Sequence, residues 1–209
     1  MTTQTALLQL EGLTQRFKSG FTVGPINASL GPGLYHLQGA NGSGKTSLLK
    51  TICGQWKPSA GRCLVRGQDT WSQHKARGHI GLLPAHPDQP GFMTVDECWR
   101  FHAAMRCAPD WDGVTLRQAL GLPGDLPLEH GSAGQRRRAE LLAALAGDPC
   151  VLLLDEPFAN LDTEALALVR GWLERWRTQR VIVLIDHQPP QMDMDACWVL
   201  QPGTPMTLA

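Results

Sequence analysis

The sequence predicts an α/β domain built on a mostly parallel β-sheet that is covered by helices. Short apolar runs at residues 151–154 and 181–185 have the length of buried strands. Helix-like stretches at residues 45–53 and 163–177 alternate with these strands, which is typical of a parallel, helix-covered sheet. The chain has 209 residues and is 43% hydrophobic, which is enough for one domain with a sizeable core.

Short β-type segments dominate the beginning of the chain. They are separated by glycine and proline at Gly24-Pro25 and Gly31-Pro32-Gly33. This pattern predicts an antiparallel β subdomain on the N-terminal side of the parallel core. The further expected strands cover residues 7–10, 21–30, 34–38, 63–66, 80–83 and 197–200.

The pattern becomes helical between about residues 94 and 142. The residues that fall on one face of the first expected helix are Val95, Cys98, Trp99, His102 and Met105. Prolines and glycines between residues 109 and 127 break the stretch into short helices. We interpret residues 85–147 as an inserted helical subdomain, and residues 1–84 and 148–209 as the core of a single domain spanning 1–209.

Composition and charge exclude several classes of partner. The formal net charge is +0, so we expect no nucleic-acid partner. The N-terminus lacks the features of a secretory signal, and no apolar run approaches the roughly 20 residues that cross a bilayer. Any membrane role is therefore expected to come through a partner.

The six cysteines form no Cys-x-x-Cys pair. A core of this size needs no disulfide framework, so we interpret them as reduced, small apolar residues. Metal ligation is the lesser alternative.

Residues 39–46 form a glycine-rich segment that matches G-x-x-x-x-G-K-[ST] and lies between an expected strand and an expected helix. Glycines let consecutive N–H groups surround phosphate oxygens, and the helix start adds partial positive charge. Lys45 is predicted to neutralise the β- and γ-phosphates, and the Thr46 hydroxyl to ligate Mg²⁺. A flexible loop is the alternative. The predicted nucleotide-binding residues here are Gly39, Ala40, Asn41, Gly42, Ser43, Gly44, Lys45, Thr46 and Ser47.

The strand at residues 151–154 ends in two acids, Asp155 and Glu156. A buried strand can deliver Asp155 beside the phosphate loop, where it would help to hold Mg²⁺. Glu156 is then placed to orient and deprotonate an attacking water; two solvated acids that merely cap a strand are the alternative. Beyond the strand at 181–185, His187 is expected to face the ligand crevice and reach the γ-phosphate.

The segment Gly131-Ser132-Ala133-Gly134-Gln135 precedes the acidic pair by about twenty residues. It resembles the signature motif of ABC ATPases, commonly Leu-Ser-Gly-Gly-Gln. The resemblance covers nearly the whole chain, because the phosphate loop, the signature, the acidic strand end, the Asn160-Leu161-Asp162 turn and His187 occur in the family's order. It implies a P-loop NTPase core that binds and hydrolyses ATP with Mg²⁺.

The same resemblance implies a head-to-tail dimer that clamps two ATP molecules. Ser132, Gly134 and Gln135 would contact the nucleotide bound by the opposite subunit, and Asp162 would contact that subunit. Phe17 occupies the place of the adenine-stacking aromatic, with core packing as the alternative. In the run Arg136–Arg138, Arg138 matches a family arginine, and a solvated helix face is expected for at least one of the others.

The chain departs from the family pattern at three positions. Gly131 replaces the signature leucine, and Ala133 replaces the first signature glycine, as in cytochrome c maturation (haem exporter) ATPases. A glutamine that touches Mg²⁺ and the attacking water is replaced by Ala85 or His86, while Gln89 is out of register. We therefore expect hydrolysis that is slow or dependent on a partner.

The leading functional expectation is an ATPase subunit that powers an ABC transporter through separate integral membrane subunits. Such a chain would be cytoplasmic and peripheral, on the inner face of the plasma membrane. The apolar face that bears Trp99 is expected either to dock on those subunits or to pack in the core. A non-transport ABC ATPase and an ATP-binding module with little turnover remain as alternatives. The cargo and the direction of transport are not identified by these residues.

Overall fold

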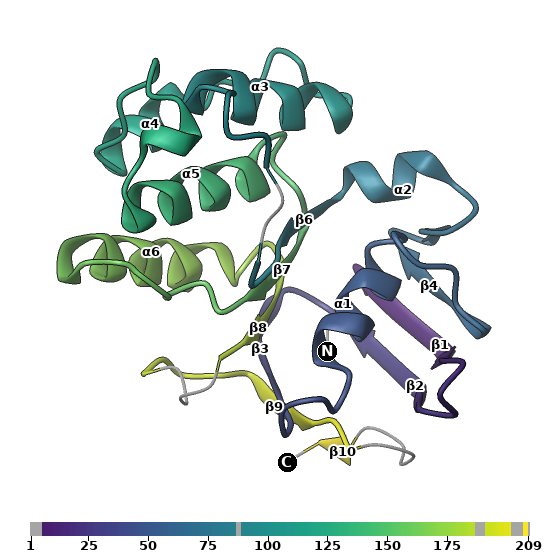
Figure 1. Ribbon diagram of the computed structural model, residues 1–209. Coiled ribbons are helices and arrows are strands. Elements are labelled where there is room, and N and C mark those ends of the chain that lie inside the picture. The colour runs from purple at the N-terminus through teal and green to yellow at the C-terminus, as the bar shows by residue number, and fades with distance from the viewer. Residues whose placement is uncertain (1–5, 87–88, 187–190, 202–206, 209) are drawn as a thin grey trace.

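Two β-sheets organise the fold, and helices cover them (Figure 1). The computed structural model describes residues 6–86, 89–186, 191–201 and 207–208. The four-stranded antiparallel sheet, in the order β2-β1-β4-β5, contains β1 (Leu8–Arg16), β2 (Thr22–Leu30), β4 (Ala60–Val65) and β5 (Gln68–Asp69). The six-stranded sheet, in the order β10-β9-β3-β8-β7-β6, contains β3 (Gly33–Gln38), β6 (Ile80–Leu83), β7 (Val151–Asp155), β8 (Val181–Ile185), β9 (Ala196–Val199) and β10 (Thr207–Leu208).

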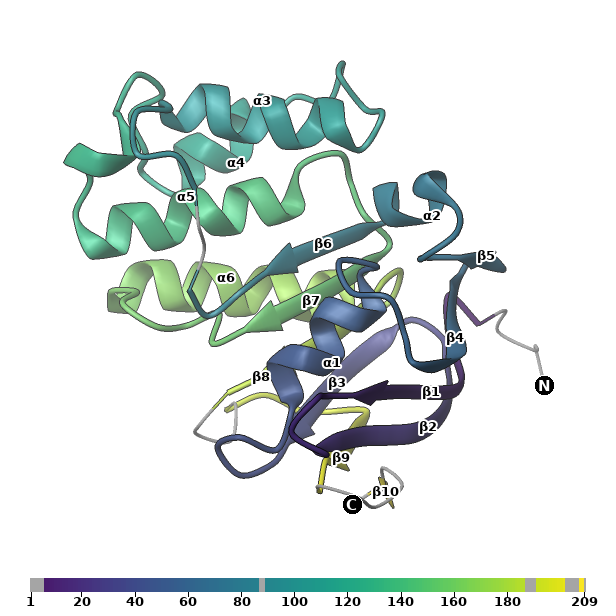
Figure 2. The ribbon, with the colours of Figure 1, turned by 45° about the vertical axis from the view of Figure 1, so that its right-hand side comes forward.

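The helices connect these strands and form a separate lobe. They are α1 (Lys45–Ile52), α2 (His74–Gly78), α3 (Val95–Met105), α4 (Val114–Ala119), α5 (Ala133–Leu145) and α6 (Thr163–Trp176), with a short 3₁₀ turn at Leu128–His130. Figures 1 and 2 show α3, α4 and α5 grouped together, away from the antiparallel sheet. The expected subdomain boundaries at residues 84/85 and 147/148 stay a prediction.

The larger sheet is mostly parallel, as predicted. Strand β3 pairs in parallel with β8 and β9, and β7 pairs in parallel with β6 and β8, whereas β10 runs antiparallel to β9. The strands that precede the phosphate loop and the acidic pair therefore end at the same edge of the sheet. Open parallel sheets bind ligands at this edge.

Strand β7 alternates between two clusters of buried side chains, as a strand covered on both faces must. Val151 and Leu153 face the cluster that contains α1 and the antiparallel sheet. Leu152 and Leu154 face the cluster that contains α5 and α6. Each fully buried leucine contributes about 2 kcal/mol of hydrophobic stabilisation, so this strand anchors both layers.

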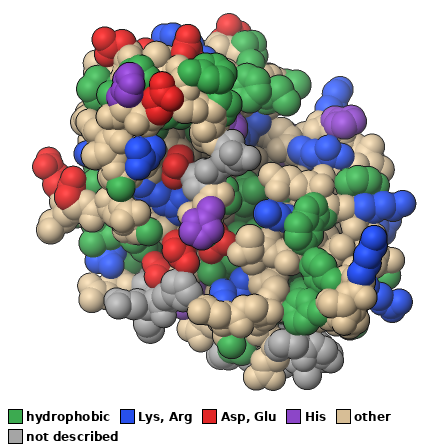
Figure 3. Space-filling view, viewed as in Figure 1, with side chains coloured by type: hydrophobic (Ala, Val, Ile, Leu, Met, Phe, Trp, Pro, Cys, Tyr) green, Lys and Arg blue, Asp and Glu red, His purple; other side chains and the backbone are tan. Residues whose placement is uncertain are grey.

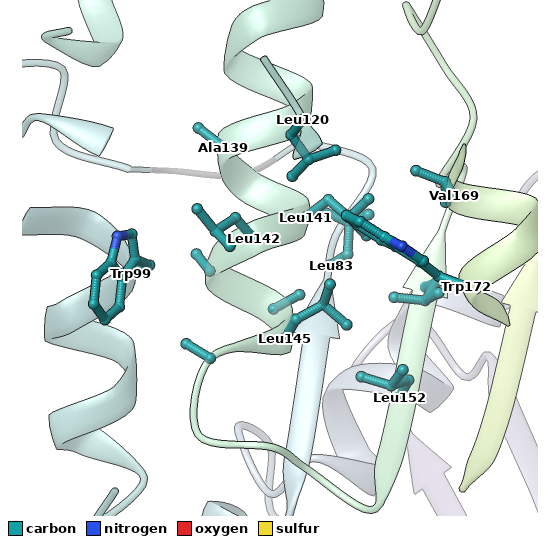
Figure 4. Close-up of a cluster of buried hydrophobic side chains, with 14 of the residues drawn as sticks. Leu83, Trp99, Leu120, Ala139, Leu141, Leu142, Leu145, Leu152, Val169 and Trp172 are labelled. Carbon is teal, nitrogen blue, oxygen red and sulfur yellow. The ribbon is translucent and has the colours of Figure 1, made fainter. Parts of the chain in front are cut away.

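Helix α5 is the centre of the second cluster, as Figure 4 shows. It stands between Trp99 on α3 and Trp172 on α6, with Leu142 directed toward the former and Leu141 toward the latter. Trp99 is only 4% exposed, which assigns it to the core and makes the alternative docking role wrong for this side chain. Met105 is 68% exposed, so the predicted apolar face fails at the last residue of α3.

Other sequence predictions differ from the structure in short elements. Strand β5, helix α2 and strand β10 were not predicted, because segments of two to five residues carry too little periodicity. The end of α1 is followed by a glycine that its backbone conformation requires. Gly54 has φ +72°, and an added Cβ would lie 2.3 Å from the carbonyl oxygen of Thr70, so only glycine fits there.

The cysteines behave as small apolar side chains. All six are free, and Cys53, Cys63, Cys98 and Cys150 are buried. Burial raises the pKa of the Cys63 thiol to about 12, which keeps it protonated. Among the described residues, no helix is both long enough and apolar enough to cross a bilayer.

Candidate nucleotide-binding site

A cavity of about 660 Å³ opens at the carboxyl edge of the parallel sheet. A volume of this size suits a small-molecule ligand. Segments far apart in the sequence meet there, from the antiparallel sheet, the phosphate loop, the end of β6 and the end of β7. The lining residues are Phe17, Ser19, Phe21, Asn41, Gly42, Gly44, Lys45, Thr46, Ser47, Lys50, Pro84, Ala85, His86, Asp155, Glu156 and Ile185.

The phosphate loop joins β3 to α1, as predicted. Gly44 is the N-cap of α1 and provides no side-chain cap, so no side chain of this residue competes for the first amides of the helix. These amides and the helix dipole favour an anion at that position. The N-terminus of α1 is therefore suited to phosphate.

Two glycines of this loop are sterically required. A Cβ on Gly39 would lie 2.5 Å from Ser43 Oγ and 2.7 Å from the carbonyl oxygen of Leu200. A Cβ on Gly44, whose φ is +98°, would lie 2.3 Å from Val23 Cγ2. The loop thus rests directly on β2 and on the segment after β9.

The Lys45 ammonium lies across the loop. Its Nζ donates to the carbonyl oxygens of Gly39 at 2.7 Å and Ala40 at 3.1 Å. This position brings a positive charge to the cavity wall beside the amides of α1, where a triphosphate would require it.

The two predicted metal ligands contact each other. Thr46 Oγ1 donates to Asp155 Oδ2 at 2.8 Å. Asp155 is 3% exposed, and its burial raises the pKa of the carboxyl group, an effect that the hydrogen bond from Thr46 opposes. A hydroxyl beside a desolvated carboxylate is a donor set that fits Mg²⁺, which prefers oxygen ligands and would offset the buried negative charge.

Glu156 has an unusual backbone conformation. Its φ is +51°, in the left-handed region that non-glycine residues adopt at a cost of about 1 kcal/mol or more. Its N–H donates to the carbonyl oxygen of Ile185 at 2.8 Å, which ties the end of β7 to the end of β8. His187, which is predicted to reach the γ-phosphate, lies outside the described residues.

Two aromatic side chains, Phe17 and Phe21, also line the cavity. Phe17 and Phe21 have ring centroids 5.6 Å apart, and Phe17 lies 5.8 Å from Trp56. Phe17 is partly buried against the core and also lines the cavity. Both interpretations of Phe17 therefore find support, and its stacking on adenine stays a prediction.

The signature residues do not line the cavity. Ser132 and Gln135 instead form a capping box at the start of α5, in which the Gln135 N–H donates to Ser132 Oγ at 3.1 Å and the Ser132 N–H donates to Gln135 Oε1 at 2.9 Å. A Cβ on Gly134 would lie 2.9 Å from the carbonyl oxygen of Asn160. The signature glycine therefore permits close packing on the turn before α6.

Asp162 begins α6 rather than reaching the cavity. Its Oδ1 accepts from the Ala165 N–H at 2.8 Å, which makes it the N-cap of that helix. Its Oδ2 lies 3.8 Å from Arg138 Nη1 on α5. This ion pair links Asp162 to the signature helix, and contact between Asp162 and a second subunit stays a prediction.

The segment after β6 carries no glutamine into the cavity. Ala85 and His86 line it, and His86 also lines a second hollow between the two lobes. Gln89 is held elsewhere, with its Nε2 3.0 Å from His102 Nε2 and its Oε1 accepting from Cys98 Sγ at 3.7 Å. The sequence predicted that Gln89 is out of register with the family's glutamine, and its position outside the cavity agrees.

Sequence reasoning missed several lining residues. Two of them could have been found from their spacing in the sequence. Phe21 lies four residues after Phe17, and Lys50 lies four residues after Thr46, so each is close enough to share a surface with a predicted site residue. Pro84 and Ile185 carried no such signal, since they resemble any other residue at the end of a strand.

Known proteins share this arrangement. The family model described as "ABC transporter" matches residues 24–159. A sulfate/thiosulfate import ATP-binding protein of Thermosynechococcus vestitus is 35% identical over 176 residues, which cover 80% of this chain and 52% of that protein. A cytochrome c biogenesis ATP-binding export protein of Pseudomonas savastanoi pv. phaseolicola is 36% identical over 144 residues, or 67% of this chain and 68% of that protein.

Solved structures give the same fold. The ATP-binding subunit of an ABC transporter superposes with a TM-score of 0.83 at 20% identity, covering 95% of this chain and 90% of the other. A dimeric ATP-binding cassette bound to ADP and Pi gives a TM-score of 0.77 at 19% identity, covering 93% of this chain and 94% of the other. The chain spans about half the length of the sulfate-import relatives that it matches.

The family match covers more than half of the chain, and its residues include the phosphate loop and the acidic end of β7. The relatives extend the match over most of the remainder. The chain belongs to the ABC transporter family.

Proposed function

We propose that the chain is the ATP-binding and ATP-hydrolysing subunit of an ABC transporter, acting on the cytoplasmic face of a membrane through separate membrane subunits. The observation that carries the proposal is the meeting of Lys45, Thr46, Asp155 and Glu156 on one cavity wall. The names of the relatives, which are import and export ATP-binding proteins, support the same reading.

The proposed binding mode follows from the charges. The triphosphate lies over the N-terminal amides of α1, with the Lys45 ammonium moving from the loop carbonyls to phosphate oxygens. Thr46 and Asp155 would hold Mg²⁺, which would supply positive charge to neutralise the phosphates. The base lies along the aromatic wall that includes Phe17.

Hydrolysis transfers the γ-phosphoryl group to water. Glu156 orients the water and accepts its proton, the water oxygen forms a bond to phosphorus, and the bond to the β-phosphate oxygen breaks. The products are ADP and inorganic phosphate. His187 contributes a hydrogen bond to the γ-phosphate in this proposal.

A second copy completes the site. Ser132, Gly134 and Gln135 lie at the N-terminus of α5, outside the cavity of their own chain. Facing the γ-phosphate of a second copy would use their amides and the helix dipole. A structural relative bound to ADP and Pi is dimeric, which supports a working form with two copies.

The surface between the lobes is the proposed contact with membrane subunits. A hollow of about 530 Å³ lies there, and its walls include Ile80, Leu82, His86, Gln89, His102 and Met105. Large apolar side chains are exposed nearby, at Phe92 (76%), Phe101 (51%) and Met105 (68%). In the space-filling view hydrophobic side chains gather over α3 (Figure 3). Such a patch fits an apolar cytoplasmic segment of a membrane partner.

The test of this function is the substitution Glu156→Gln. We expect ATP affinity to stay within about threefold, while the hydrolysis rate falls by at least about 100-fold because the base is lost. The matched control is Glu164→Gln, an exposed acid in the first turn of α6. Equal hydrolysis rates for wild type and Glu156→Gln would refute the assignment of the base.

The position of Ala85 and His86 on the cavity wall favours one alternative, an ATP-binding module with little turnover. Neither side chain supplies the amide that the family uses at this point. The two functions separate on reconstitution with the membrane subunits. Stimulated hydrolysis supports the motor, whereas tight ATP binding with no turnover supports the module.

A further inference from the structure

The guanidinium of Arg137 reaches from the signature helix into the acidic end of β7. Its Nη2 donates to the carbonyl oxygens of Asp155 at 2.5 Å and Glu156 at 2.7 Å. Its Nη1 donates to the carbonyl oxygen of Pro84 at 2.9 Å and to Glu140 Oε2 at 3.2 Å. One side chain therefore joins α5, the end of β6 and the end of β7.

This arginine is buried, unlike a member of a solvated charge run. Arg137 is 4% exposed, and its partner Glu140 on the next turn of α5 has a side chain that is 15% exposed. Burial of a cation is costly unless its charge is paired and its donors are used. Here a carboxylate pairs the charge, and together with three backbone carbonyls it uses both Nη groups, whereas Nε has no hydrogen-bond partner among the described residues. The three carbonyls belong to the segments that carry the predicted chemistry.

Arg137 contacts the backbone of Glu156 where that backbone is in the left-handed conformation. Glu156 is held at φ +51°, and its N–H is already bonded to the carbonyl oxygen of Ile185. Its carbonyl oxygen accepts from Arg137 and also from the Ala159 N–H at 3.2 Å. Strained residues persist only where the surroundings fix them, and Arg137 supplies the part of that fixation that comes from the helical lobe.

Only arginine provides this geometry. Its planar group offers five donors in a fixed fork, whereas lysine has one compact ammonium on a flexible stem. A lysine at 137 keeps the charge near Glu140 but cannot bridge the three carbonyl oxygens together.

We propose that Arg137 is a positioning residue for hydrolysis: it fixes the backbone of Glu156 to α5 and to Pro84, so that the base is aimed only while the signature helix is docked. The inference rests on the proposed role of Glu156 as the base. Movement of α5 when a second copy engages Ser132 would then reach Glu156 through one buried side chain, in a chain that has Ala85 and His86 where the family has its linking glutamine.

The experiment compares Arg137→Lys with a matched control, Arg117→Lys. The Arg117 side chain is 17% exposed and likewise pairs with a carboxylate, with its Nε 3.0 Å from Asp96 Oδ1 and its Nη1 donating to the carbonyl oxygen of Leu122 at 2.7 Å. All of its contacts stay within the helical lobe. A general loss of arginine packing would therefore affect both variants alike.

We expect Arg137→Lys to lower kcat by about 10- to 100-fold and to change KM for ATP by less than about twofold, because only the aim of the base is lost. Hydrogen exchange should rise in the backbone of residues 156–161, since the carbonyl of Glu156 loses a donor. Arg117→Lys should leave kcat and this exchange unchanged. The exchange measurement needs no turnover. It therefore tests whether Arg137 fixes the backbone of Glu156 even when basal hydrolysis is slow.

A double variant keeps the inference testable if Arg137→Lys fails to fold. Arg137→Gln combined with Glu140→Gln removes both charges together and leaves no unpaired buried charge, and the same loss of kcat and of protection is expected. Wild-type kcat and wild-type exchange in either Arg137 variant would overturn the inference. Failure of wild type to bind ATP, or unchanged hydrolysis in Glu156→Gln, would instead overturn the proposed function.

Discussion

The hydroxyl of Thr46 donates a 2.8 Å hydrogen bond to the carboxylate of Asp155, although the two residues are 109 positions apart in the chain. Thr46 lies in the first turn of α1, and Asp155 ends β7. The contact exists because β3 and β7 both flank β8 and end at the same sheet edge. It brings the two side-chain oxygens that are the predicted Mg²⁺ ligands within 2.8 Å of each other.

Substitution of Thr46 tests this pair. Thr46→Val keeps the shape and removes the hydroxyl, so we expect the Mg²⁺ concentration needed for half-maximal hydrolysis to rise by about tenfold or more. Thr46→Ser keeps the hydroxyl and serves as the control, with a change below about threefold. Identical Mg²⁺ dependence in all three proteins would remove Thr46 from the metal site.

The two capping boxes provide a matched pair of alanine substitutions. Ser132 caps α5 and Thr94 caps α3, each with the residue three positions later bonding back. Loss of either cap is expected to cost about 1 kcal/mol of unfolding free energy, measured in urea. Only Ser132→Ala should also reduce ATP-dependent dimerisation. Light scattering measures this in proteins that also carry Glu156→Gln. Equal dimerisation in both variants would show that Ser132 serves the helix alone.

The partly buried imidazole of His102 predicts loss of stability in acid. Burial, helped by Arg106, lowers its pKa from 6.5 to about 4. Between these values the unfolded chain binds more protons than the folded chain, so stability falls as pH drops from about 6.5 toward 4. We expect about 1–3 kcal/mol from this group.

His102→Gln should flatten the decline between pH 6.5 and 4 in urea unfolding curves. The control is His130→Gln, because the side chain of His130 is 70% exposed. A decline that persists unchanged in His102→Gln would assign the acid sensitivity to other groups.

Two glycines of the phosphate loop should differ sharply in their tolerance of alanine. Gly44 combines φ +98° with a Cβ position 2.3 Å from Val23, whereas Gly42 has φ +78° and nothing within 4 Å of its Cβ position. Gly42→Ala is expected to cost about 1 kcal/mol from backbone strain alone, and Gly44→Ala at least about 2 kcal/mol, because atoms must also shift. Denaturant unfolding measures both. A smaller loss for Gly44→Ala would contradict the steric argument.

The sequence predicted the sheet and the phosphate side of the site because both depend on local patterns. The apolar runs at β7 and β8 and the glycine-rich turn before Lys45 each point to one structure. The buried strand that ends at Asp155 predicted that this acid lies beside the phosphate loop, and the hydrogen bond from Thr46 agrees.

Other features depend on tertiary contacts that no local pattern records. The helical period of α3 is the same whether Trp99 packs inside or docks outside, so burial decided it. The run Arg136–Arg138 resembled a solvated face, yet its middle member is buried against two carbonyls of the acidic turn. The left-handed backbone of Glu156 carried no signal either, because no glycine marks it.

The exposed side chains of α3 have a consequence for how such a protein diversifies. Phe101 and Met105 belong to neither buried cluster, so exchanging them removes nothing from the interior. Under the proposed function, inherited changes there would alter which membrane subunit the chain contacts, while the phosphate loop around Lys45 stays the same. Under that proposal, one ATP-binding domain can serve different membrane subunits.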